Sequence, residues 1–126
     1  MRTAIMCAAL ALTVTAAEAV EKDAASANFF LPYCKTALTD QANHRSFPAG
    51  VCVGSIRGVA AMLLILQPLM RQHRDLALCA DIPGDVTPEQ MIRVVIRYIE
   101  ANPKDMHELF EGLAMLALVD AWPCKN

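Results

Sequence analysis

The chain has 126 residues, a formal net charge of −2 and 56% hydrophobic residues. This length supports one small domain with a single core and excludes two such domains. The charge is close to neutral and forms no run of one sign, which argues against nucleic acid as a partner.

The N-terminus has the layout of a secretory signal peptide. Arg2 supplies the positive charge, an uncharged stretch follows, and Ala17-Glu18-Ala19 is an A-x-A cleavage site. The uncharged stretch is shorter than the ~20 apolar residues of a membrane-spanning helix. Cys7 lies inside this stretch rather than after it, which disfavours a lipid anchor. We therefore expect residues 1–19 to be a cleaved signal peptide and residues 20–126 to be the mature, exported domain.

Two helices are predicted in the first half of the mature chain. The first runs from about residue 24 to 40, and Pro32 either kinks it or sets its start near Leu31. The second runs from about 49 to 66. Its last two turns are apolar on every side, so we expect it to be the buried centre of the domain.

The second helix carries three glycines spaced four residues apart, at Gly50, Gly54 and Gly58. Each costs roughly 1 kcal/mol relative to alanine inside a helix. Close approach of another backbone would offset that cost, from the fourth helix or from a second copy of the chain. Arg57 interrupts the apolar run and Pro68 follows it, so no membrane span is expected in the mature chain.

Two more helices are predicted after the loop 71–86. Thr87 and Gln90 form a T-x-x-Q capping box around Pro88, which marks the start of the third helix. Asn102-Pro103 ends that helix and starts the fourth, and Trp122-Pro123 stops the fourth. The pattern predicts an all-α fold: a compact four- to five-helix bundle.

Four cysteines remain in the mature chain, namely Cys34, Cys52, Cys79 and Cys124. Their even number in an oxidising compartment predicts two structural disulfides that stabilise the bundle. The sequence contains no C-x-x-C motif and no zinc-finger spacing of cysteine and histidine. Three pairings are possible and sequence alone does not choose among them. We favour Cys34–Cys52, which would join neighbouring helices, and Cys79–Cys124, which would tie the chain end to the loop before the third helix.

No constellation for catalysis is present. The histidines His44, His73 and His107 share no helix face at a metal-ligand spacing, and neither G-x-S-x-G nor a phosphate-binding glycine loop occurs. Asp81 and Asp85 alone make a weak cation site. The sequence therefore predicts a protein that is not an enzyme and uses no metal or cofactor.

The order of several short motifs resembles the Rap1a/Tai family of immunity proteins over about residues 28–124. The motifs are Tyr33-Cys34, Gly50-Val51-Cys52-Val53-Gly54, the run from Cys79 to Gln90, Val94-Val95-Ile96-Arg97-Tyr98-Ile99, Asn102-Pro103 and the terminal run from Ala117 to Cys124. The resemblance implies a periplasmic helical protein that protects its producer. Members of the family bind peptidoglycan amidase effectors delivered by type VI secretion and block their active sites, and members are often dimeric, so a homodimer is an open alternative.

The resemblance implies inhibition by binding, in which a rigid scaffold inserts a loop into the groove of the amidase. The two segments expected to present such a loop are 71–85, stiffened by Cys79, and the connector 43–48. The partner-binding residues predicted within them are His73, Arg74, Asp75, His44 and Arg45.

A competing interpretation is a small, disulfide-bonded periplasmic stress chaperone of the HdeA-like kind. Such a protein would dissociate and bind clients at low pH. The sequence holds three histidines and no dense titrating cluster, which favours the immunity protein.

Overall fold

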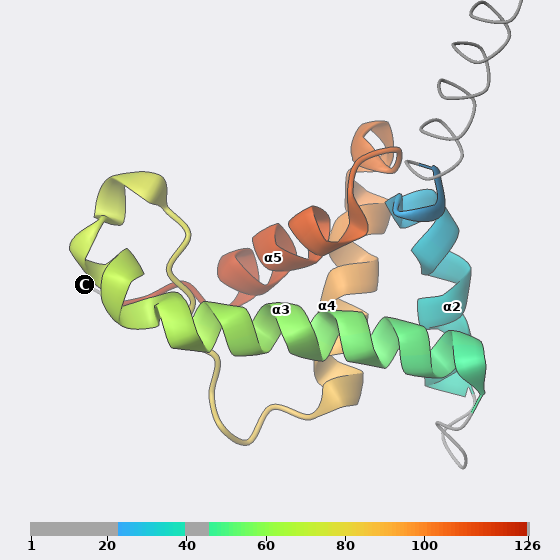
Figure 1. Ribbon diagram of the computed structural model, residues 1–126, viewed down its shortest axis with the longest axis horizontal. Helices are drawn as coiled ribbons and strands as arrows, with labels where there is room; N and C mark the ends of the chain where they lie inside the picture. Colours follow the sequence, from blue (N-terminus) through green and yellow to red (C-terminus); the bar gives the residue numbers. More distant parts are fainter. Residues whose placement is uncertain (1–22, 40–45, 126) are drawn as a thin grey trace, which may run out of the picture.

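The computed structural model describes residues 23–39 and 46–125, which form four α-helices and two 3-10 turns (Figure 1). The helices are α2 (Ala27–Thr39), α3 (Phe47–Gln72), α4 (Pro88–Ala101) and α5 (Phe110–Ala121). The 3-10 turns are η1 (Arg74–Leu76) and η2 (Pro103–Asp105). Within the described ranges, the extended pairing is limited to two isolated bridges, Ser26 with Leu109 and Ala80 with Pro123. The predicted all-α bundle is confirmed, whereas the predicted signal peptide and the residues His44 and Arg45 lie outside the described ranges.

Both predicted disulfides are present. Cys34 on α2 is bonded to Cys52 on α3, with the two Cα atoms 5.1 Å apart. Cys79 is bonded to Cys124 across 45 positions of sequence, with a Cα–Cα distance of 5.3 Å. In the loop-entropy account, each bridge stabilises the fold by about 3–4 kcal/mol, because it restricts the unfolded chain.

The core is built from one stripe of each helix. Phe110 on α5 is fully buried and stacks on Phe30 of α2, with ring centroids 4.4 Å apart and an interplanar angle of 7°. Helix α3 packs against α2, α4 and α5. Its buried stripe recurs at intervals of three and four residues and consists of Ala49, Cys52, Ile56, Ala60 and Leu63.

The start of α4 matches its sequence signature. The Thr87 hydroxyl accepts a hydrogen bond from the Gln90 backbone N–H at 3.2 Å, and the Gln90 side chain accepts one from the Thr87 N–H at 2.8 Å. Pro88 occupies the first helical position, where no hydrogen-bond donor is needed. The capping box therefore fixes the direction in which the chain leaves the preceding loop.

Helix α3 is longer than predicted, since it runs from Phe47 to Gln72 and contains Pro68. An internal proline costs about 3 kcal/mol because it removes one helical hydrogen bond and crowds the preceding turn. Side chains on either side of it offset part of that cost by contacting the returning chain: Gln67 donates to the Ala80 carbonyl and Arg71 to the Asp81 carboxylate. Tertiary contacts thus continue the helix where the local signal predicts an end.

The expectation that the apolar part of α3 is the buried centre was wrong for most of its residues. Ala60 and Leu63 are buried, whereas Met62, Leu64, Ile65 and Leu66 are exposed. The glycines do not meet another helix within the chain either, because a Cβ atom added at Gly50, Gly54 or Gly58 would meet no atom within 4 Å apart from its own stretch of helix. Only one side of α3 is covered by the other three helices.

Arg57 and Pro68 do not make the apolar stretch of this helix too short to span a membrane, contrary to the expectation from the sequence. With 26 residues, α3 is long and apolar enough to cross a membrane when judged by length and composition alone. One side of the helix is nevertheless packed against the bundle and bonded through Cys52 to α2.

The two remaining differences concern the residues at which helices begin. Helix α2 begins at Ala27, so Pro32 lies inside it and does not set its start near Leu31. The fourth helix begins at Phe110 rather than after Asn102, since the Asn102 side chain instead donates to the Tyr98 carbonyl at 2.8 Å and closes the end of α4.

Contacts with the N-terminal segment explain the late start of α5. Ala27 and Asn28 donate backbone hydrogen bonds to the carbonyls of Glu108 and Met106, at 3.0 and 2.8 Å. Phe110 donates to the Ala25 carbonyl at 2.9 Å. Residues 106–109 are therefore paired with a distant segment and do not join the helix.

Burial on α5 predicts opposite outcomes for two nearby leucines. Leu118 is 0% exposed and Leu116 is 40% exposed. Leu118→Ala should lower the free energy of unfolding by about 2–5 kcal/mol, because it leaves a cavity in the core. Leu116→Ala is the matched control and should lower it by less than about 1 kcal/mol. Urea denaturation measures both, and equal losses would contradict this packing of α5.

Candidate functional site

The end of α3 and the 3-10 turn η1 project beyond the rest of the bundle (Figure 1). His73 caps the end of α3, and Arg74 and Asp75 open η1. All three side chains are exposed. The structure thus brings three of the five predicted partner-binding residues together in one turn at the tip of the molecule.

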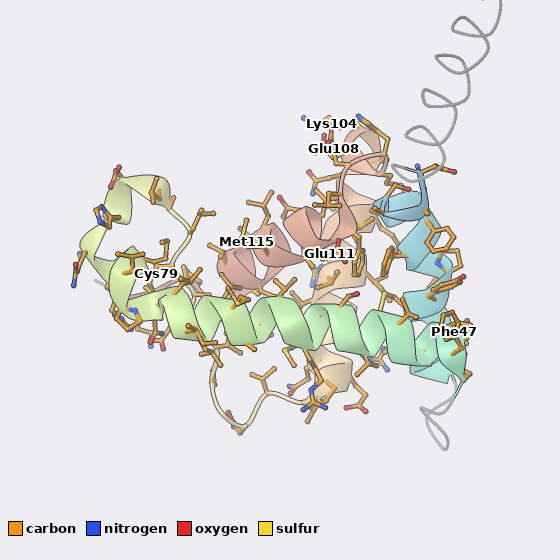
Figure 2. All side chains as sticks on the ribbon, in the orientation of Figure 1. Phe47, Cys79, Lys104, Glu108, Glu111 and Met115 are labelled. Atoms are coloured by element: carbon orange, nitrogen blue, oxygen red, sulfur yellow. A yellow bond between two sulfur atoms is a disulfide. The ribbon has the colours of Figure 1, made fainter. Side chains whose placement is uncertain are left out.

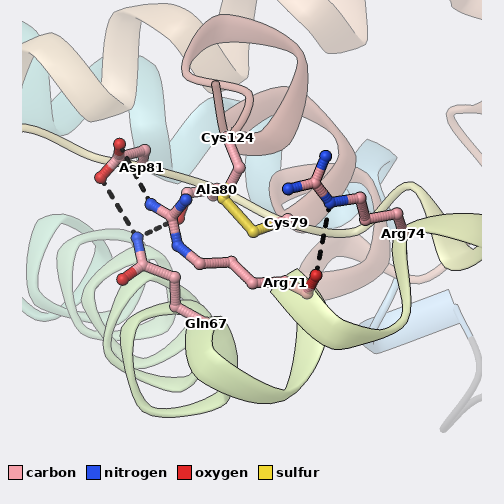
Figure 3. Close-up of a disulfide and its surroundings, with 7 residues drawn as sticks. All are labelled: Gln67, Arg71, Arg74, Cys79, Ala80, Asp81 and Cys124. Carbon is pink, nitrogen blue, oxygen red and sulfur yellow. Dashed lines mark hydrogen bonds and ion pairs between the residues drawn. A yellow bond between two sulfur atoms is a disulfide. The ribbon is translucent and has the colours of Figure 1, made fainter. Parts of the chain in front are cut away.

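Polar contacts hold the chain that returns from this turn against α3 (Figure 3). Gln67 donates to the Ala80 carbonyl at 3.0 Å and to the Asp81 carboxylate at 3.2 Å. Arg71 forms a salt bridge with Asp81 at 3.4 Å, and the Arg74 guanidinium donates to the Arg71 carbonyl at 3.4 Å. The salt bridge is close to half exposed, so its net contribution is small, about 0–1 kcal/mol. The contacts determine the position of the loop more than the stability of the fold.

The C-terminal segment fastens the other side of the same loop. Cys79 is bonded to Cys124. Asp81 donates its backbone N–H to the Trp122 carbonyl at 2.7 Å, and Cys124 donates to the Cys79 carbonyl at 3.0 Å. Between η1 and Cys79, Ala77 has a φ of 50°, in the left-handed region that non-glycine residues seldom adopt. We call residues 73–79 the tip loop, and it is held at both of its ends.

A small pocket of about 200 Å³ opens beside this disulfide. Cys79 and Cys124 form part of its wall, together with apolar residues from α3 and α5. Its charged lining residues are Arg71, Arg74 and Lys125, and none of the described residues that line it is acidic. The disulfide is therefore partly exposed in a positively charged environment.

The uncovered side of α3 is a second surface. Phe47, which Figure 2 labels, lies at its start and is 77% exposed. Ile65, farther along the helix, is 69% exposed. Between them, Gly54 and Gly58 border an apolar groove of about 500 Å³ whose other wall is formed by Gly112 and Met115 of α5. Exposed apolar area of this kind marks surfaces that contact another molecule.

The described residues contain no group of three or more His, Cys, Asp or Glu side chains that could hold a metal ion. His107 lies before α5, where it contacts Glu108 at 3.1 Å with its side chain 67% exposed. Two surfaces of the described residues stand out: the tip loop, which is polar and exposed, and the uncovered apolar side of α3, called the outer side below. Both surfaces suit binding.

Sequence reasoning located the tip loop but missed the outer side of α3 as a surface. A signal for it was available: bulky apolar residues stand at both ends of the outer side and glycines stand in the middle. A helix buried all round has the same composition, so only the packing of the chain separates the two cases.

The family model of the Rap1a immunity proteins matches the chain over residues 26–124. No curated protein and no solved structure matches it significantly. The family match includes all four described helices and all four disulfide-bonded cysteines. The chain therefore belongs to the Rap1a immunity protein family.

Proposed function

We propose that this protein is a periplasmic immunity protein that binds and blocks a peptidoglycan amidase effector of type VI secretion, without catalysis of its own. The observation that supports the proposal most directly is the family match over residues 26–124. The site supports it as well, because a projecting, fastened loop is a suitable element to enter the groove of an enzyme. The tip loop is the proposed inhibitory element.

Rigidity is the property that such a loop needs. Immobilising a flexible, rotamer-rich side chain at an interface costs about 0.5–1.5 kcal/mol, and ordering a loop adds to that cost. The tip loop is already held by Gln67, Arg71 and the Cys79–Cys124 bond, so it loses less freedom on binding. A complex of ordinary size would bury about 1,600 Å² in total, with a few central anchors.

Export to the periplasm is part of the proposal. It rests on the signal-peptide layout of residues 1–19. The two disulfides agree with it, because such bonds persist in oxidising compartments.

We also propose that the outer side of α3 pairs with a second copy of the chain. The seam along this side is exposed except at the half-buried Val51, and it is symmetric about Gly58. An antiparallel pairing centred there brings Phe47 to Leu69, Val51 to Ile65 and Gly54 to Met62. Bulky residues then meet at both ends, and small residues let the two backbones approach at the crossing. A two-fold interface requires such self-complementarity.

The binding proposal predicts that charge reversal at the tip loop weakens binding and protection. Arg74→Glu and Asp75→Arg should each weaken binding to a purified, co-encoded secreted amidase at least about tenfold, because anchors of an interface carry most of the affinity. Calorimetry measures the affinity, and survival of cells that express the amidase in the periplasm measures protection.

Arg93→Glu is the matched control, since Arg93 is an exposed arginine on α4. It should leave binding and protection unchanged. Wild-type protein that neither binds nor protects against any co-encoded cell-wall hydrolase would refute the proposed function.

The proposed dimer predicts a specific cross-link. Gly58→Cys places a thiol on the two-fold axis, so oxidation should give a covalent dimer on non-reducing gels. Gly54→Cys should give almost none, because its two copies would lie about 12 Å apart along the antiparallel helices, beyond the ~7 Å limit for a disulfide.

The two cysteine variants separate the possible arrangements. Equal cross-linking at both positions would indicate a parallel pair and contradict the antiparallel axis. As a second measurement, Ile65→Arg should convert the dimer to a monomer in analytical ultracentrifugation, whereas Leu64→Arg, beside the seam on the same helix, should not. A monomeric wild type, or one that sediments with membranes, would refute the dimer.

A further inference from the structure

The two disulfides of this chain lie in opposite environments. Cys34 and Cys52 are both 0% exposed in the core between α2 and α3. Cys79 and Cys124 are partly exposed and form part of the wall of the pocket of about 200 Å³. Thiol–disulfide exchange requires an attacking thiolate to reach one of the two sulfur atoms. An external thiolate has such access to the second bond and not to the first.

The charge around the Cys79–Cys124 bond also favours its reduction. Arg71, Arg74 and Lys125 line the pocket (Figure 3 shows the two arginines). Both the attacking thiolate and the departing cysteine thiolate are anions, and nearby positive charge stabilises them. Asp81 offsets part of the charge of Arg71, with which it forms a salt bridge at 3.4 Å.

The exposed bond also controls the tip loop. Cys79 ends that loop, and Cys124 lies in the segment that follows α5. Without the bond, hydrogen bonds such as those between Asp81 and Trp122 and between Gln67 and Ala80 would remain, but no covalent link. The buried bond and the apolar core would still hold the four helices together.

We propose that the Cys79–Cys124 disulfide is a redox-sensitive fastening of the tip loop, which an external dithiol opens while the Cys34–Cys52 disulfide stays intact. A thiolate of the dithiol attacks one sulfur of the bond, and the other cysteine leaves as a thiolate that takes up a proton. The second thiol of the dithiol then attacks the mixed disulfide. Two cysteine thiols form on the protein, and the dithiol is oxidised to its own disulfide. The effect on partner binding rests on the proposed function, whereas the order of reduction does not.

Graded reduction tests which of the two disulfides opens first. The folded protein is treated with increasing dithiothreitol, quenched with N-ethylmaleimide and digested, and alkylation at each cysteine is measured by mass spectrometry. Cys79 and Cys124 should be alkylated at least about tenfold faster than Cys34 and Cys52, since exchange depends on access and local charge. Equal rates, or earlier alkylation of the buried pair, would overturn the proposal.

Charge variants test the pocket. Arg74→Gln combined with Lys125→Gln should slow the reduction of Cys79–Cys124 several-fold. Arg93→Gln combined with Arg97→Gln, on the exposed side of α4, should not change that rate. If neither pair alters the rate, the electrostatic part of the proposal is wrong.

A variant without the Cys79–Cys124 bond tests whether this bond affects partner binding. Cys79→Ser combined with Cys124→Ser should retain the helical circular dichroism of the wild type but bind the co-encoded amidase at least about tenfold more weakly. Unchanged binding would refute control of the loop by this bond. Failure of the oxidised wild type to bind any such amidase would refute the proposed function, and the alkylation order would still decide the redox inference.

Discussion

The packing of one side of α3 against the other three helices is the constraint on which the rest of the molecule depends. Cys52, Ile56 and Leu63 are buried on that side, and the bond from Cys52 to Cys34 locks it to α2. Because the buried stripe ends at Leu63 while the helix continues to Gln72, the last turns extend beyond the core. One-sided burial therefore produces both an overhanging loop and an uncovered apolar surface.

Local signals predicted the features that depend on local chemistry. The capping box at Thr87 and Gln90 satisfies backbone groups within one turn, so sequence was sufficient to place the start of α4. The even number of cysteines predicted two bridges, because a small domain gains much from cross-links that join segments far apart in sequence. The pairing itself was a choice among three, and the structure decides it. The tip loop followed from the same reasoning, since Cys79 fastens a polar segment between two apolar helices.

Long-range contacts determine the helix boundaries that local sequence patterns predicted wrongly. Pro68 predicts the end of a helix, but Gln67 and Arg71 contact a segment that returns from more than a turn away. Asn102 predicts the start of a helix, but backbone pairing with Ala25 and Ala27 holds residues 106–109 out of it. In each case the competing contact lies in a part of the chain that a local pattern does not contain. The uncovered side of α3 belongs to the same class, because burial is a property of the whole fold.

Binding of a partner at the tip loop and pairing of two chains through α3 are geometrically compatible. In an antiparallel pair centred on Gly58, the C-terminal ends of the two α3 helices would lie about 40 Å apart, at a rise of 1.5 Å per residue. Each tip loop would then project from an opposite end of the dimer, and a partner bound at one end would not obstruct the other. A parallel pair would instead place both loops side by side and bring two bulky partners into collision. The seam on α3 and the position of the tip loop thus favour the same arrangement for independent reasons: one from the matching of side chains, the other from the space that a partner needs.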